Sequence, residues 1–474
     1  MKKIHKILSF GILLFIAGCS LAPKFQKPQI NEPQTYLNDS IPYDSLRSDT
    51  VINLRWWEIF NDPTLNNLIK TGLANNNNIL IAASRIEEAR AALGFTKANA
   101  YPFFDIQAGG GTGNYSGMRL AQVTNNFFIM PSLAWEIDIW GKFRSANLAA
   151  RAELFATEAN YKAMQIELIS AISNTYFLLL DYRERLEISK RTLATRDSSL
   201  AIMQMRFDKG VIPEIDLNQA QIQRSIAAAA IPFYTRMVAN TQYGLSVLLG
   251  QYPNAIKTGT GIMEMNPELE IPSGMPASLL ERRPDIIAAR ETAAAQNARI
   301  GVAIAQRLPA ISLTGTMGLA SSQLSSLTGD GLAWAAGASL LSPLFEFNKN
   351  KRRVDIEKAR AEQALYMYRQ AALTAFKEVE NALVEIETRK QELEAYKQQV
   401  KAAVNAERLS RMRYDKGATS YLELLEAQRN SFNAQLQLAQ NTQALLNAYV
   451  NLYKALGGGW ISAEEEQNAN QQGQ

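Results

Sequence analysis

The chain has 474 residues, of which 47% are hydrophobic and 20% are charged, and this balance excludes wholesale disorder. Its formal net charge of +4 depends on three lysines close to the N-terminus, so the charge indicates no nucleic-acid partner. The only histidine and the only cysteine, His5 and Cys19, also lie near that end. Once this segment is processed, no His-based triad, thiol nucleophile or Cys/His zinc site remains. We therefore expect no enzymatic activity, no cofactor and no metal.

Residues 1–18 have the pattern of a lipoprotein signal peptide. Lysines precede an apolar run over residues 7–17, which is too short to span a bilayer. The small residues of Ile16–Cys19 resemble the bacterial lipobox, so we expect Cys19 to be acylated and to become the anchored N-terminus. An ordinary signal peptide with a chance cysteine is the alternative. Ser20 replaces the aspartate that retains some lipoproteins in the inner membrane, which favours the outer membrane.

Residues 19–62 are predicted to form an extended arm leading from this lipid anchor. The segment is rich in Pro, Asn, Asp and Ser, and its prolines disfavour a regular helix or a central strand. Trp56, Trp57 and Phe60 come near its end. We expect these aromatic side chains to attach the arm to the folded body.

Residues 63–250 are predicted to form a helix, two strands and a long helical hairpin. Two segments after Pro102 alternate apolar and polar residues, as strands with one apolar face do. A soluble sandwich and a lipid-facing barrel wall both fit this alternation. A proline-free stretch over 142–208 then predicts a helix about 100 Å long. The next helix reaches about residue 249, and Pro232 is expected to kink or interrupt it.

Three acidic residues occupy polar positions of these strand segments, namely Asp105, Glu136 and Asp138. Paired carboxylates also occur in glycoside hydrolysis. At alternating strand positions they are more simply interpreted as charges that line a pore.

Residues 276–457 repeat the plan after a Pro/Gly-rich connector over 251–275. A helix, two strands, a proline-free helical stretch over 348–415 and a last helix follow in the same order. Apolar residues in 348–415 recur every seven positions, as in helices packed in coiled coils. The Gln/Asn-rich residues 458–474 predict a disordered tail.

One short block shows that the two halves are copies of one unit. Met205–Gly210 returns as Met412–Gly417, at a spacing of 207 residues, and each copy lies between two long helical patterns. A glycine that ends one helix just before another begins indicates a tight reversal. The fold class is therefore mainly α with a small β part, built from an internal two-fold repeat.

The four strands of about ten residues suit a membrane, but four strands cannot close a barrel. An open sheet edge is not tolerated in lipid, so several chains would have to share one barrel. Two chains would give eight strands with a filled interior, whereas three would give twelve strands and a lumen. Three twin-repeat chains would also wrap their helices into a long α-helical barrel.

Several motifs, in this order, resemble those of the TolC-like outer-membrane efflux factors, in the lipoprotein branch that serves resistance-nodulation-division (RND) pumps. They are Ala22–Phe25 after Cys19, Trp57–Leu65, Arg282–Ile286, Leu308–Leu313 and the two Asp-Lys-Gly tips. The resemblance covers residues 19 to about 460.

The resemblance implies a homotrimer with a twelve-stranded barrel in the bacterial outer membrane and a long helical barrel in the periplasm. Its connector over 251–275 would contribute to an equatorial belt. Such proteins are passive exit ducts of tripartite efflux systems. Their partners are a periplasmic adaptor, also called a membrane fusion protein, and an inner-membrane RND transporter.

The hairpin tips are the candidate functional sites. The resemblance implies adaptor docking at both tips, through Asp208, Lys209 and Gly210 and through Asp415, Lys416 and Gly417. It also implies a periplasmic aperture near the second tip, where Glu423 and Glu426 share a helix face and where Arg413 and Tyr414 hold the tip closed. Plain helix caps and a solvated helix face are the alternatives. The first tip keeps Asp216 but has Gln219 in place of the second acid.

Two other functions remain open at this point. A duct for type I protein secretion uses the same fold, and a periplasmic coiled-coil adaptor lipoprotein shares the helical pattern. An adaptor of that kind usually has one helical hairpin and more β-structure than this chain. The sequence names neither the transported substrate nor the pump.

Overall fold

The computed structural model describes residues 21–26, 37, 56–113, 124–265, 280–329 and 332–458. The signal peptide, Cys19, most of the arm, residues 266–275 of the connector and residues 459–474 lie outside this part. The chain divides into two compact units, which are described separately. Unit 1 contains residues 1–30, 84–158 and 288–370, and unit 2 contains the remaining residues.

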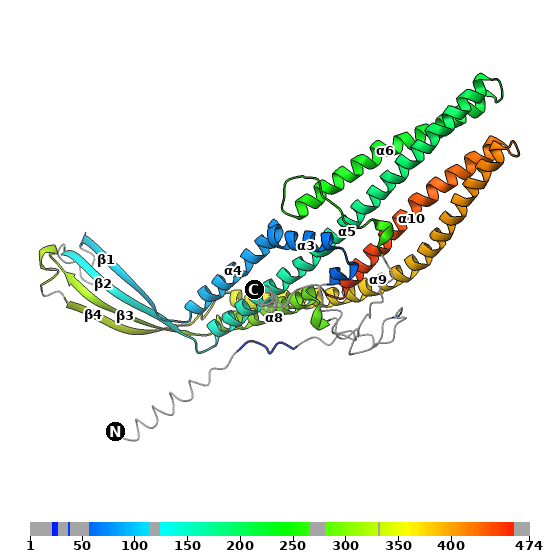
Figure 1. Cartoon of the computed structure of the whole chain (residues 1–474). Coiled ribbons are helices and arrows are strands. Elements are labelled where there is room, and N and C mark those ends of the chain that lie inside the picture. Colours follow the sequence, from blue (N-terminus) through cyan, green and yellow to red (C-terminus); the bar gives the residue numbers. More distant parts are fainter. Residues whose placement is uncertain are drawn as a thin grey trace, which may run out of the picture. The chain divides into compact units, whose positions relative to one another are not determined.

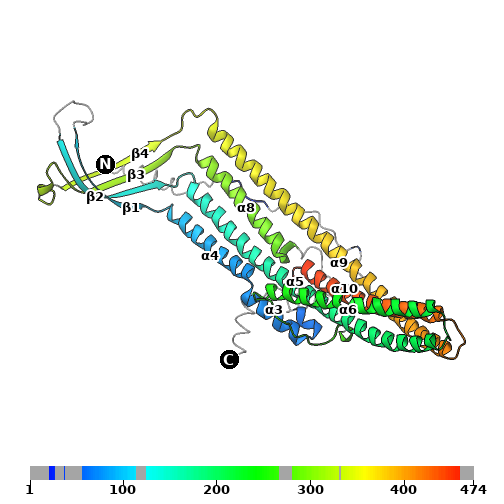
Figure 2. The ribbon, with the colours of Figure 1, turned by 90° about the horizontal axis from the view of Figure 1, so that it is seen from above.

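Unit 1 contains one antiparallel sheet with the strand order β1-β2-β3-β4 (Figure 1). The bounds are β1 Phe103–Gly113, β2 Thr124–Ile137, β3 Ala310–Ser321 and β4 Leu332–Leu341. Four helices adjoin the strands: α4 (Asn77–Ala98), α5 (Lys142–Asp208), α8 (Pro284–Ala305) and α9 (Lys349–Asp415). Figure 2 shows these helices following one another in the same order as the strands. The predicted four strands are therefore confirmed, and β1 and β4 are open edges of the described sheet.

The two faces of the sheet differ in character, and the pairing register fixes which residues share a face. Leu133 pairs with Gly315, and Gly315 pairs with Ala336, so these three residues lie on one face of the sheet. This face is here called the apolar face. It also carries Phe104, Ile106, Trp135, Leu313, Met317, Trp334 and Leu340. Asp105 pairs with Ser132, and this second face, the polar face, also carries Gln107, Glu136, Ser312, Thr314, Thr316 and Ser339. The period-two pattern of the sequence thus produces one apolar and one polar surface.

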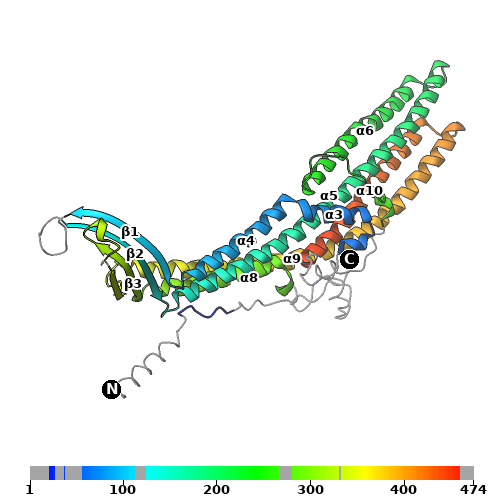
Figure 3. The same ribbon diagram turned by 60° about the vertical axis from the view of Figure 1, so that its left-hand side comes forward.

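Unit 2 contains the long helical hairpins (Figure 3). The first is formed by α5 and α6 (Glu214–Leu248), and the second by α9 and α10 (Tyr421–Ala455). α3 (Pro63–Asn75) and the short 3₁₀ turns η1 (Trp56–Phe60) and η2 (Ile262–Glu264) complete unit 2, while η3 (Leu324–Ser326) belongs to the sheet region. The predicted helix over 142–208 is confirmed. Pro232 is expected to kink or interrupt the next helix, and the structure shows no interruption there. α6 continues through this residue.

The end of the arm is attached to unit 2, as its aromatic residues predict. Trp56 is fully buried and stacks on Tyr453 with ring centroids 5.0 Å apart. Asp62 caps α3 by accepting from Thr64 N at 2.7 Å, and its other carboxylate oxygen accepts from the Tyr176 hydroxyl at 2.5 Å. These contacts fix the start of the folded body against α5 and α10.

The Arg-Arg-Pro-Asp-Ile motif ties the start of α8 to α9 and α10. Arg283 donates to Asp285 at 2.7 Å and to the carbonyl oxygen of Ala455 at 2.9 Å, and it pairs with Glu378 at 2.7 Å. Burial lowers the pKa of Arg283, but these acceptors outweigh burial and raise its pKa above the ordinary value. A buried arginine with several acceptors is a stable arrangement, whereas removal of both carboxylates, Asp285 and Glu378, would leave an uncompensated buried charge.

The duplication extends to the backbone. Gly210 and Gly417 have φ values of 68° and 71°, and Gly250 and Gly457, which follow α6 and α10, have 68° and 73°. Each pair is 207 residues apart. The helices of both repeats therefore end in the same left-handed turn, for which glycine carries no Cβ penalty.

The paired hairpin tips as a candidate functional site

Both tips are built on the same hydrogen-bonded turn. In the first, Gly210 N donates to Phe207 O at 2.8 Å and Val211 N to Arg206 O at 2.9 Å. In the second, Gly417 N donates to Tyr414 O at 3.0 Å and the following N–H to Arg413 O at 2.8 Å. This is a Schellman motif, which satisfies the last carbonyls of a helix. The glycines thus act as helix caps, which was one of the two interpretations of the tips.

The space around the tip glycines is open. A Cβ built on Gly210 or Gly417 would have no neighbouring atom within 4 Å. The flanking residues Asp208, Lys209, Asp415 and Lys416 are all exposed. The backbone of each turn is therefore accessible to a partner, which is the property that a docking tip requires.

The two hairpins pack against each other through a small apolar core just behind the tips. Met203 of α5 and Ala220 of α6 meet Tyr421, Leu424 and Leu425 of α10, and all five are buried. Burial raises the pKa of Tyr421 to about 12, although Arg196 acts in the opposite direction. The tips thus form one packed unit within a single chain.

Polar contacts also cross between the hairpins. The guanidinium of Arg206, at the end of α5, lies 5.0 Å from the ring centroid of Tyr414, at the end of α9. The same guanidinium is 3.8 Å from the carboxylate of Asp415. The Tyr414 hydroxyl lies 3.2 Å from the sulfur of Met203. Tyr414 therefore joins the two tips of one chain, through partners that come from the first hairpin. Its role in closing an aperture stays a prediction.

The two glutamates of the predicted aperture have different surroundings. Glu423 is half-buried, and its carboxylate accepts from Arg413 Nη1 at 2.9 Å and from the Thr419 hydroxyl. Glu426 is exposed, and its polar partners are Arg429, at 3.5 Å, and Asn430, at 3.4 Å. Glu423 therefore holds the second hairpin together, whereas Glu426 presents its charge to the surroundings.

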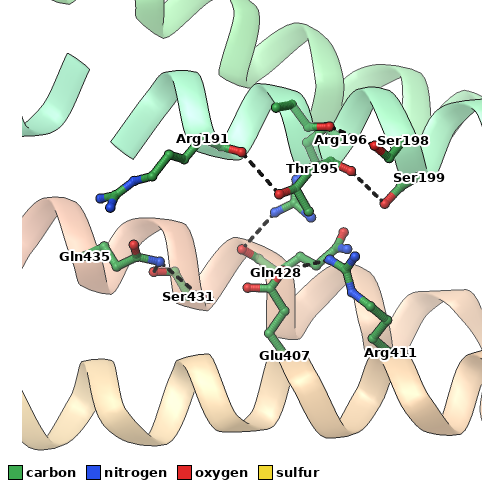
Figure 4. A network of polar contacts seen from close by, with 11 residues as sticks. Arg191, Thr195, Arg196, Ser198, Ser199, Glu407, Arg411, Gln428, Ser431 and Gln435 are labelled. Carbon is green, nitrogen blue, oxygen red and sulfur yellow. Dashed lines mark hydrogen bonds and ion pairs between the residues drawn. The ribbon is translucent and has the colours of Figure 1, made fainter. Parts of the chain in front are cut away.

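A buried polar group lies farther along the hairpins, as Figure 4 shows. Arg196 of α5 is only 5% exposed, and it donates to the backbone carbonyl of Gln428 in α10 at 3.1 Å. Burial lowers the pKa of Arg196, and Glu407 of α9 partly offsets this. Glu407 is itself paired with Arg411 at 3.2 Å. The hydrogen bond from Arg196 to Gln428 spans 232 residues of sequence and joins the two repeats.

Of the three acidic residues predicted to lie on strands, Asp105 and Glu136 do so and Asp138 does not. Asp105 accepts a hydrogen bond from the Ser132 hydroxyl, and Glu136 is 2.8 Å from Lys142 Nζ; both acids belong to the polar face. The placement of Asp138 on a strand is wrong, because β2 ends at Ile137. Its carboxylate accepts from Phe143 N and Arg144 N, each at 3.0 Å. It therefore caps α5, where a carboxylate is favourable to the helix dipole.

Sequence reasoning missed three residues of the tip region, namely Arg196, Met203 and Tyr421. Periodicity shows that such residues lie on a helix, but it does not show which helix they meet. The recurrence of Gln221 as Gln428 was the one available signal near Arg196. Among the residues that the structure describes, no group of three His, Cys, Asp or Glu side chains is arranged to hold a metal.

Comparisons with known proteins agree with this architecture. The family model described as "Outer membrane efflux protein" matches residues 68–251 and 275–458, one segment in each repeat. SrpC of Pseudomonas putida, a solvent efflux pump outer membrane protein, is 33% identical over 466 residues, which cover 96% of this chain and 98% of SrpC. SilC of Salmonella typhimurium, a probable outer membrane lipoprotein, is 31% identical over 465 residues, covering 96% of this chain and 99% of SilC.

The fold matches as well as the sequence. The crystal structure of the Campylobacter jejuni CmeC outer membrane channel superposes with a TM-score of 0.88 at 27% identity, over 96% of this chain and 98% of that one. The mainly helical fold with four strands, the internal repeat and the predicted efflux role are thereby confirmed. The chain belongs to the outer membrane efflux protein family and is the non-enzymatic outer-membrane channel of a tripartite efflux system.

Proposed function

We propose that three copies of this chain form the channel, with their sheets closed into one twelve-stranded barrel. The observation that carries this proposal is the open sheet of unit 1, whose edge strands β1 and β4 have no partner among the described residues. Unpaired strand edges are not tolerated in hydrocarbon, so an outer-membrane protein of this kind has to pair them with other copies. Twelve strands leave a lumen, whereas eight would be filled by side chains.

The exposure of the apolar face supports a lipid environment. Phe104, Ile106, Trp334 and Leu340 are between 67% and 74% exposed in the single chain. Soluble monomers rarely expose a contiguous apolar surface of this extent. The strand lengths of 10 to 14 residues are sufficient for tilted membrane strands.

The helices of unit 2 also carry uncovered apolar residues, which a second copy would bury. On α6 these recur at multiples of a helical turn: Ile215, Ile222, Ile226, Phe233 and Val247, each at least 45% exposed. A row of this kind is typical of a helix that packs against a partner helix. We assign it to the contact between copies.

The tips are proposed as the periplasmic mouth of the trimer, with six tips in all. The exposed turns at Gly210 and Gly417 would receive the periplasmic adaptor. Tyr414, through Arg206, and Arg413, through Glu423, would hold the mouth closed, and Glu426 would supply the charge that a permeating ion meets. Asp105 and Glu136 would line the lumen of the barrel.

Cys19 is proposed as the acylated residue that adds a lipid anchor to the barrel. The lipobox pattern supports this, and so does the likeness to SilC, which is named a lipoprotein. The inner-membrane partner is proposed to be an RND transporter. SrpC is named for a solvent efflux pump, which favours this role over type I protein secretion. The chain has two helical hairpins and one four-stranded sheet, whereas an adaptor usually has one hairpin and more β-structure, so an adaptor role is disfavoured.

The trimer is tested by sedimentation equilibrium of the purified mature protein in mild detergent, followed by conductance measurements in planar bilayers. We expect a mass of three chains and discrete conductance steps. A monomer in detergent, with no steps in the bilayer, would refute the shared barrel. An Ile222→Asp/Ile226→Asp variant, with charges in the exposed row of α6, should shift the sedimentation toward monomer. The matched variant Gln223→Asp should remain trimeric.

A further inference from the structure

A pocket of about 430 Å³ lies in unit 1, where the strands join the helices, and among the roles proposed above only that of Glu136 touches its lining. It lies within the range of roughly 300–1,000 Å³ that is typical of pockets for drug-sized molecules. Its apolar wall includes Trp140, Leu308 and Leu341, and its charged wall comes from the start of α9. Of its lining residues, Glu136, Ala310 and Leu341 belong to the polar face of the sheet.

Among the described residues, two cations of this pocket have no carboxylate partner. Arg353 donates from Nη1 to the amide oxygens of Gln306, at 2.9 Å, and Asn350, at 3.4 Å, both of which are neutral. Lys349 has no ion pair in the described part of the chain. The opposite wall differs, because Lys142 is neutralised by Glu136, with 2.8 Å to each carboxylate oxygen. Two further acids line the pocket, Asp138 and Glu346. Asp138 caps α5 and pairs with Arg144 at 3.5 Å, so Lys349, Arg353 and Glu346 are left as the unpaired groups and sum to one positive charge.

Comparison of the two repeats shows how this charge arises. Lys142 corresponds to Lys349, at the common spacing of 207 residues, but its partner Glu136 corresponds to Pro343. The capping residue Asp138 corresponds to Phe345. Residues 136–146 contain two acids and two bases, whereas residues 343–353 contain one acid and four bases. The second repeat has therefore kept the lysine of this junction and lost both acids beside it.

We propose that this pocket binds the anionic group of a small amphiphile in transit through the channel. A carboxylate, sulfonate or phosphate would accept from Lys349 and Arg353, while the apolar body would rest on Trp140, Leu308 and Leu341. The pocket opens on the polar face, which points away from lipid in the proposed barrel. Its place inside the duct rests on the proposed trimer, but its chemistry belongs to a single chain.

The test uses two dyes that share an aromatic body and differ in charge. 8-Anilino-1-naphthalenesulfonate carries a sulfonate, and N-phenyl-1-naphthylamine is neutral. Fluorescence titrations are made on the full mature protein in nanodiscs of phosphatidylcholine, with empty nanodiscs subtracted. We expect saturable binding of the sulfonate to wild type. The variant Lys349→Gln/Arg353→Gln should weaken it by about tenfold or more, because two cations that contact the anion are removed.

The matched control is Lys351→Gln/Arg352→Gln, which removes two cations from the same turns of α9 that do not line the pocket. It should leave sulfonate binding unchanged, and neither double variant should alter binding of the neutral dye. Equal losses in the two double variants, or equal responses of the two dyes, would refute the pocket as an anion site. Displacement of the sulfonate by phosphatidylglycerol in the nanodisc would assign the pocket to lipid and overturn the proposal.

Conductance of the same preparations separates this proposal from that of the trimer. A wild type that binds the sulfonate but never conducts would refute the shared barrel and leave the anion pocket standing. A wild type that conducts but shows no saturable sulfonate binding would refute the anion pocket and leave the shared barrel standing.

Discussion

Arg206 and Tyr414 join the two hairpins of one chain, with the guanidinium 5.0 Å from the centre of the phenol ring. The corresponding residues of the other copy, Arg413 and Phe207, make no such pair, because Arg413 turns to Glu423 of its own hairpin. The two tips therefore share a backbone turn but use their arginines differently. One arginine links the hairpins and the other closes a hairpin on itself.

The first prediction concerns this link. Arg206→Ala should increase the equilibrium constant for tip opening about fivefold, because a partly exposed cation–π contact contributes about 1 kcal/mol. The change is read as a larger fraction of time in the high-conductance state in planar bilayers. Lys209→Ala, which removes an exposed cation from the same tip, is the control. Equal gating in Arg206→Ala and wild type would show that the contact does not hold the mouth.

The second prediction separates the two glutamates of α10. Glu423→Gln should lower the free energy of unfolding by about 1 kcal/mol, because the charge-assisted bond from Arg413 is lost. Glu426→Gln should change stability by less than about 0.5 kcal/mol, as expected for an exposed side chain. It should instead reduce cation preference, measured as the reversal potential in a KCl gradient. The assignment fails if Glu423→Gln alters selectivity more than Glu426→Gln does.

The third prediction concerns the tip glycines. Gly210→Ala and Gly417→Ala should each destabilise the protein by about 1–2 kcal/mol, because an L-residue is strained in the left-handed region. Clashes with other parts of the chain contribute nothing, since no heavy atom beyond the adjacent residues lies within 4 Å of the added methyl group. Gly244→Ala, in the interior of α6 with equal free space, should stabilise by about 0.5–1 kcal/mol. Chemical denaturation measures the change in unfolding free energy of each variant. A change of the same sign in all three variants would contradict the prediction.

The fourth prediction is a pH dependence. Burial raises the pKa of Tyr421 to about 12, whereas the unfolded chain should titrate near the ordinary value of about 10. The preference of the fold for the neutral phenol therefore contributes fully below about pH 10 and is lost as pH rises toward 12. Two pKa units correspond to an upper limit of about 3 kcal/mol.

Denaturation of wild type and Tyr421→Phe between pH 9 and 12 tests this dependence. The variant should lose less unfolding free energy over that interval than wild type, since it has one buried phenol fewer. Tyr252→Phe, at a tyrosine that is 93% exposed, should follow wild type. If the unfolding free energy fell equally with pH in all three proteins, ionisation of Tyr421 would not be the cause of alkaline destabilisation.

Local patterns predicted the elements closely, because each long helix is bounded by residues with strong local preferences. The absence of proline over 142–208 and the glycine at 210 mark both ends of α5, and the same holds for α9 and Gly417. Pro232 does not interrupt α6, although proline removes one backbone hydrogen bond of a helix. Asp138 was wrongly assigned to a strand, because alternation cannot show where a strand ends and a helix cap begins.

The site was less accessible to sequence reasoning, because it depends on contacts between residues about 200 positions apart. Arg206 was visible as part of the repeated block, but nothing in its neighbourhood points to Tyr414 rather than to Asp216. Duplicated sequences imply equivalent surroundings, and at the tips this inference fails. The two copies pack against each other, so equivalent residues face different partners.

The apolar core behind the tips also constrains the order of events when the protein is made. Met203 and Ala220 emerge in the first half of the chain, but Tyr421, Leu424 and Leu425 come only near its C-terminal end. Contacts so distant in sequence form slowly, and an apolar surface that waits for its partner is prone to aggregation. The first hairpin is therefore synthesised before the residues that cover its apolar end, and this end stays uncovered until the second hairpin folds against it.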